Sequence, residues 1–166
     1  MISCELARAL RTAGVRWTPV TGDHFRIERD GFDGDVFTVS EMTIEAHEYP
    51  SGTVLGFNGT TEWALDSVSL EDSLWLPRED QLRELLRGTF RSLRRVTEPQ
   101  LRFVVEVVLG GQLRNFDDAA AENAYAQALL ALVSSVAVDL DDVDALEGNV
   151  LDADTVGAPC RADERA

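Results

Sequence analysis

The chain contains no lysine, so its fifteen basic residues are all arginines. This absence excludes the nucleotide-binding loops that use a lysine to hold phosphate groups. Acidic residues number thirty, and the net charge at pH 7 is −15. A chain this acidic repels a phosphate backbone, whereas nucleic-acid-binding proteins present a basic face to it. We therefore expect no nucleic acid among its partners.

Cysteine is scarce, and the two residues present, Cys4 and Cys160, lie near opposite ends of the chain. Their spacing fits no metal-binding or redox motif, so the sequence predicts neither a disulfide nor a cysteine-bound metal. Long apolar runs are also missing. The longest, Ala128 to Val138, falls short of the roughly 20 residues that span a bilayer. The first residues lack the order of a signal peptide, and we expect a cytoplasmic protein with no membrane partner.

Apolar residues make up 45% of the 166 residues, enough for one domain with its own core. Alternating segments predict strands, and segments with an apolar residue every three or four positions predict helices. The sequence thus predicts a single α+β domain over residues 1–138, with a small antiparallel sheet and packed helices. Residues 139–166 are acidic and predict a flexible tail. The aspartates from Asp139 to Asp144 lack the glycine and glutamate of a calcium-binding EF-hand loop.

Cap and turn residues position the elements along the chain. Ser3 is a typical N-cap for a first helix, and Gly14 is a typical residue to end it. Gly110 and Gly111 predict a hairpin, and Pro77 suits the start of a helix that the apolar spacing continues to Leu93. The predicted strands cover residues 15–18, 24–28, 37–39, 42–47, 53–57, 101–109 and 112–116, with a break near Ser40. The predicted helices cover residues 3–13, 61–68, 77–93 and 118–136.

One candidate ligand site lies between Gly56 and Asp66, where a predicted strand leads into a predicted helix. Free backbone N–H groups at the start of a helix attract anions. A simple turn followed by an N-cap explains the same residues. The candidate ligand-binding residues are Asn58, Gly59, Thr60, Thr61 and Trp63. Trp63 and Trp75 are either packing residues or the walls of an aromatic pocket.

No catalytic residue or metal ligand follows from the sequence, which also predicts no cofactor. Glu62 and Asp66 are spaced to share a helix face, where they would hold a divalent ion or simply be solvated. His24 and His47 lie in predicted strands without a nucleophile at a known spacing, and no serine sits in a nucleophile-elbow pattern. Cys4 opens a helix, where a thiol is either reactive or packed. The sequence therefore gives no support for an enzyme that uses a nucleophilic side chain.

Arginines recur at helical spacing in the second half of the chain. The stripe consists of Arg83, Arg87 and Arg91, followed by Arg94 or Arg95. Such a stripe would bind an acidic partner, a phosphate group or the acidic tail of the same chain. A solvated helix face, neutralised by Glu79 and Glu84 in neighbouring turns, is the commoner explanation of such a row.

Two tryptophan-centred strings carry a resemblance to a known group of proteins. They are NGTTEWALD, from Asn58 to Asp66, and WLPREDQLR, from Trp75 to Arg83. With these strings the chain resembles a family of small uncharacterised bacterial proteins, common in actinobacteria, some of which carry a pilus-assembly label. The resemblance covers residues 1–136, and it implies no catalytic residues.

Together these observations predict a non-catalytic, cytoplasmic protein-interaction module. Its negative surface would favour a basic partner, or the protein would bind a second copy of itself. The alternative is a small-ligand-binding protein or an enzyme that uses the segment from Gly56 to Asp66.

Overall fold

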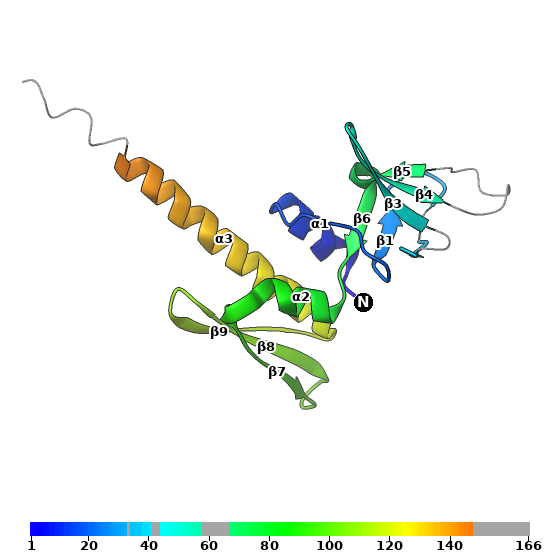
Figure 1. Cartoon of the computed structure of the whole chain (residues 1–166). Coiled ribbons are helices and arrows are strands. Elements are labelled where there is room, and N and C mark those ends of the chain that lie inside the picture. The colour runs from blue at the N-terminus through cyan, green and yellow to red at the C-terminus, as the bar shows by residue number, and fades with distance from the viewer. Residues whose placement is uncertain (33, 41–43, 58–66, 148–166) are drawn as a thin grey trace, which may run out of the picture.

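The computed structural model describes the chain except for residues 33, 41–43, 58–66 and 148–166, and it describes no side chains for residues 137–147. The described residues form an α+β fold of helices and three-stranded antiparallel sheets (Figure 1). The α-helices are α1 (Cys4–Thr12), α2 (Glu79–Leu86) and α3 (Ala121–Glu147). Two short 3-10 helices are η1 (Leu70–Asp72) and η2 (Arg87–Thr89).

The strands pair into sheets in the following orders. The first sheet is β2 (Phe37–Thr38), β1 (His24–Ile27) and β6 (Ser73–Leu76). The second is β3 (Ile44–Tyr49), β4 (Gly52–Phe57) and β5 (Ser67–Ser69). The third is β7 (Phe90–Val96), β8 (Arg102–Leu109) and β9 (Gln112–Asp118).

The first sheet is shared by two hydrophobic clusters, because its two faces are both buried. Phe25 of β1 lies opposite Trp75 of β6, and Phe25 belongs to a cluster formed with β2 to β5. Leu74 and Leu76 of β6 point to the other face, as alternation along a strand requires. There they join the core made by α1, α2, α3 and the third sheet. β6 therefore connects the two clusters into one packed unit.

Helix α3 packs on the third sheet and extends beyond it (Figure 1). Tyr125 and Leu129 of α3 are buried in the same cluster as Val105 and Val107 of β8. The helix ends at Glu147, well past the predicted end of the domain at residue 138. Leucine and valine continue to recur every three residues there, at 140, 143 and 146, which extends the helical periodicity into the acidic segment.

Several local predictions are confirmed where cap or turn chemistry is strong. The Ser3 hydroxyl accepts a hydrogen bond from Leu6 N at the start of α1. Gly14, just beyond α1, has φ +89°, a conformation that disfavours any side chain. The turns at Tyr49–Gly52 and Gly110–Gly111 join hairpins. Asp118 Oδ1 accepts from Ala120 N, but Asp118 ends β9, and α3 begins at Ala121 and not at the predicted residue 118. Ser40 also forms an isolated antiparallel bridge with Ile44.

Other predicted elements are wrong. Residues 15–18 are irregular rather than a strand, and Val68 lies in β5 rather than in a helix. The helix predicted over residues 77–93 ends at Leu86, and β7 follows from Phe90. A register shift between Phe90 and Ser92 places Phe90 and Leu93 opposite Val107 and Val105 on one sheet face. This bulge puts apolar residues three apart, which imitates helical spacing.

Among the described residues, no helix combines the length and the apolar character needed to cross a membrane.

Candidate functional site

The predicted ligand-binding residues lie outside the described part of the chain. They are Asn58, Gly59, Thr60, Thr61 and Trp63, together with Glu62 and Asp66. Their proposed role remains a prediction.

The predicted arginine stripe does not lie on one helix. Arg83 is on α2, Arg87 follows the last residue of that helix with φ 48°, and Arg91 is on β7. The expectation of a helical face is therefore wrong, because the helix ends after Leu86 and the chain turns into a strand. Arg91 donates hydrogen bonds to the backbone oxygens of Gly88 and Phe90.

The histidines and the described cysteine lie in separate places. His24 is on β1, and His47 on β3 lies against Gly56 with Nε2 3.7 Å from Glu45. Cys4 accepts a hydrogen bond from Arg26 Nη1 at 2.9 Å. Within the described ranges, no three His, Cys, Asp or Glu side chains gather in a way that would hold a metal ion.

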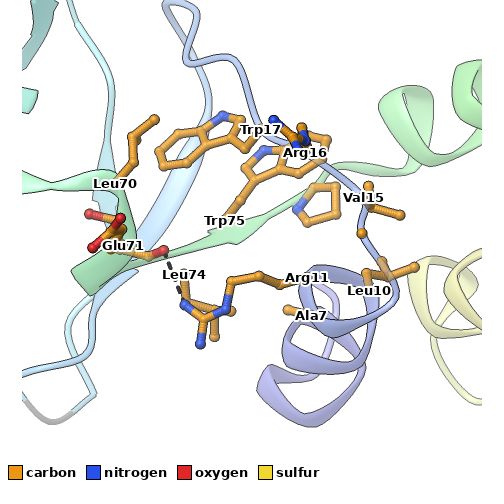
Figure 2. Close-up of a pocket in the computed structure, with 13 residues that line it drawn as sticks. Ala7, Leu10, Arg11, Val15, Arg16, Trp17, Leu70, Glu71, Leu74 and Trp75 are labelled. Carbon is orange, nitrogen blue, oxygen red and sulfur yellow. Dashed lines mark hydrogen bonds between the residues drawn. The ribbon is translucent and has the colours of Figure 1, made fainter. Parts of the chain in front are cut away.

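A hollow lies where α1 and the segment after it face β6 (Figure 2). Its volume is about 500 Å³. We call it the tryptophan pocket, and its walls include Leu10, Val15, Trp17, Leu70, Leu74 and Trp75. Arg11, Arg16 and Glu71 are its charged lining residues. Sequence reasoning missed this site because its walls come from two segments more than fifty residues apart.

Trp17 and Trp75 form an ordered aromatic wall of the pocket. Their ring centroids are 6.3 Å apart and their planes differ by 3°, and Figure 2 shows the two rings lying parallel. Alternation along β6 turns Trp75 to the same face as Phe25, and Trp17 packs on Phe25 at 5.7 Å. Both indoles also line a second hollow of about 310 Å³, on the side of α2. The stack thus presents indole surface to two hollows.

A buried carboxylate fixes the orientation of Trp17. Asp23 is only 1% exposed, and its Oδ2 accepts hydrogen bonds from Trp17 Nε1 at 2.8 Å and Val20 N at 3.0 Å. Its Oδ1 accepts from Gln81 Nε2 at 2.6 Å and from Arg78 Nη1 at 3.2 Å. Every partner of this carboxylate is a donor, which is the arrangement that a buried anion requires. Asp23 therefore links the aromatic wall to the start of α2.

The indole of Trp75 differs from that of Trp17 in its hydrogen bonding. Trp75 Nε1 is buried and meets no acceptor among the described residues. A buried N–H without a partner costs free energy, since it has lost its hydrogen bonds to water.

This difference predicts unequal effects of the same substitution at the two positions. Trp17→Phe removes a donor from the buried Asp23 carboxylate, whereas Trp75→Phe removes an N–H that bonds to no described residue. Both variants lose similar ring area, so the hydrogen bond decides the difference. We expect Trp17→Phe to lower the free energy of unfolding by about 1–2 kcal/mol more than Trp75→Phe does. Urea denaturation followed by circular dichroism measures both, and equal losses would contradict the assignment.

Ion pairs hold α1 beside β1 at the edge of the pocket. Arg8 Nε and Arg11 Nη2 each lie 2.6 Å from a carboxylate oxygen of Glu28. Arg11 Nη1 also reaches Ser73 O of β6 at 3.5 Å. Burial raises the pKa of the Glu28 carboxyl, but the hydrogen bonds and charges of Arg8 and Arg11 outweigh it, so the net pKa lies below its usual value.

The lowered pKa of Glu28 sets the sign of a pH dependence. The folded protein binds a proton at Glu28 less readily than the unfolded chain does. The ion pairs therefore stabilise the fold at pH values above about 4.5, the pKa of this carboxyl group in the unfolded chain. This contribution is lost as the pH falls through the lower folded pKa. We therefore expect Glu28→Gln to destabilise the protein at about pH 7 and to have little effect at about pH 3. A penalty that is the same at both pH values would rule out the charged pair.

No family model, curated protein or solved structure matches this chain.

Proposed function

We propose that the protein binds a small, largely apolar ligand in the tryptophan pocket. The observation that carries the proposal is a hollow of about 500 Å³ with two stacked indoles and aliphatic side chains in its walls. Ligand sites in proteins have volumes of roughly 300–1,000 Å³ and mostly apolar linings with a few polar groups. The buried hydrogen bonds to Asp23 support the same function, because they hold one wall in place before a ligand arrives.

A neutral fluorescent probe tests the proposal directly. N-phenyl-1-naphthylamine becomes bright in apolar surroundings, so titration with the protein should give a saturable signal with one site per chain. Val15→Phe would fill the pocket from a half-buried wall position and should abolish that signal. Val36→Phe is the matched control, since Val36 is 42% exposed and lines none of the described hollows. No saturable signal in the wild type, or equal binding by both variants, would refute the proposal.

We propose protein binding at the exposed edge of β7 as a second candidate function. In the described part of the chain, β7 pairs only with β8. Arg94 and Arg95 are exposed there and form no ion pair with a described residue. Consecutive residues point to opposite faces of a strand, so the edge offers positive charge on both sides. An extended acidic segment fits this edge, because it would add a strand and pair its carboxylates with the arginines.

A designed peptide of alternating glutamate and valine serves as the probe for this edge. Its binding, measured by fluorescence anisotropy, should be lost in the double variant Arg94→Glu, Arg95→Glu. Arg83→Glu is the control, because Arg83 is exposed on α2 and lies outside the strand. Equal binding of a lysine–valine peptide would show that the arginines do not select the partner. The basic partner expected from the net charge would need another surface.

A further inference from the structure

The charged groups of the tryptophan pocket are not equivalent. Arg11 is already paired with Glu28 and also donates to Ser73 O. The guanidinium of Arg16, in contrast, forms no hydrogen bond or ion pair with any described residue. Glu71 is exposed and likewise has no partner in the described ranges. The pocket therefore contains one available cation and one available anion.

The two available charges lie at different ends of the pocket. Figure 2 shows Arg16 beside the ring of Trp75, whereas Glu71 lies beside Leu70 on the opposite side of the hollow. The stacked indoles and Leu74 lie between them. A ligand that fills the pocket thus meets a positive group at one end and a negative group at the other.

We infer that the ligand of this pocket is a planar aromatic carboxylate, with its anionic group at Arg16 and its ring against the tryptophans. This inference rests on the proposed ligand-binding function and specifies its ligand. A guanidinium offers paired N–H donors that match the two oxygens of a carboxylate. An indole face favours an aromatic body over an aliphatic one of the same area. Glu71 opposes the reversed orientation, because it would place two negative charges together.

The net charge of the chain limits which residue of the pocket can hold an anion. At −15 the protein as a whole repels anions, so an anion that binds in the pocket must be held by a local cation. Arg16 is the lining residue that can supply it without first breaking an ion pair of the fold.

Two probes that differ by one anionic group test the inference. 8-Anilinonaphthalene-1-sulfonate has the ring system of N-phenyl-1-naphthylamine and adds a sulfonate, which stands in for the carboxylate. We expect Arg16→Gln to weaken binding of the sulfonate about tenfold, the change that removal of one charge-assisted hydrogen bond produces. Binding of the neutral probe should change less than about twofold, since its contacts are apolar.

Two further variants serve as controls. Glu71→Gln should strengthen binding of the anionic probe, because it removes a negative charge from the pocket. Arg114→Gln should leave both probes unaffected, since Arg114 is exposed on β9 and does not line the pocket. If Arg16→Gln leaves the affinity for the anionic probe intact while the neutral probe still binds, the inference fails and the proposed function stands. If the neutral probe does not bind the wild-type protein, the proposed function fails first.

Discussion

Asp23→Asn is expected to lower the free energy of unfolding by about 3 kcal/mol, although the two side chains have nearly the same shape. Both oxygens of the carboxylate accept from donors: Oδ2 from Trp17 and Val20, and Oδ1 from Arg78 and Gln81. The amide nitrogen of asparagine would face two donors in either orientation. It would also leave the Arg78 guanidinium without its buried counter-charge.

Asp80→Asn is the matched control, because Asp80 pairs with the same arginine from an exposed position. Exposed ion pairs contribute little, so we expect a loss below about 1 kcal/mol. Chemical denaturation at neutral pH measures both variants, and binding of the neutral probe shows whether the aromatic wall has moved. Equal losses for the two variants would mean that the buried network does not determine stability.

Phe25→Ala and Tyr125→Ala are expected to cause the other large losses, each of about 3–5 kcal/mol. Phe25 is fully buried in the cluster with β2 to β5. Tyr125 is a residue of α3 and is buried in the core between this helix and the third sheet. Since β1 contributes to one cluster and its paired strand β6 to the other, we expect either substitution to shift a single cooperative transition. Tyr49→Ala is the control, because its ring is 55% exposed, and it should change stability by no more than about 0.5 kcal/mol.

The shape of the unfolding curve is as informative as its midpoint. Tryptophan fluorescence reports on Trp63 and on Trp17 and Trp75, which lie beside the cluster around Phe25. Far-ultraviolet circular dichroism reports mainly on the helices, which pack in the cluster around Tyr125. The two signals should change together in the wild type and in both variants. Two separate transitions would show that the clusters fold as independent domains and that the single-domain prediction is wrong.

The sequence predicts those parts of the fold that depend on local chemistry. The Ser3 cap, the Gly14 termination and the Gly110–Gly111 turn each follow from a few neighbouring residues, and all three are present. A helix also follows Pro77 as expected, but it begins two residues later, at Glu79, so that Pro77 precedes the N-cap Arg78 instead of lying in the first turn. The α+β class follows from the same signals, because they separate the helical segments from the hairpins.

The remaining errors arise where distant contacts decide the structure. The bulge in β7 gives Phe90 and Leu93 a helix-like spacing, and only pairing with β8 shows that they share a sheet face. β6 is four residues long, too short for its alternation to be recognised. The tryptophan pocket could not be predicted for two reasons. Trp75 lies on this short strand, and its stacking partner Trp17 lies in an irregular segment that the sequence predicts as a strand.

The sheet shared by the two clusters also has a consequence for synthesis on the ribosome. All strands of the first two sheets have been made once Leu76 leaves the ribosome, so the cluster around Phe25 can collapse early. On the opposite face of the same sheet, Leu74 and Leu76 pack with α1, which is made first, but the rest of that core is completed only when Leu129 of α3 has been made. For those fifty or so residues the apolar side chains of α1 and β6 are only partly covered, and such surfaces are the kind that chaperones bind and that drive aggregation. A stalled or truncated product ending before α3 would keep that surface permanently.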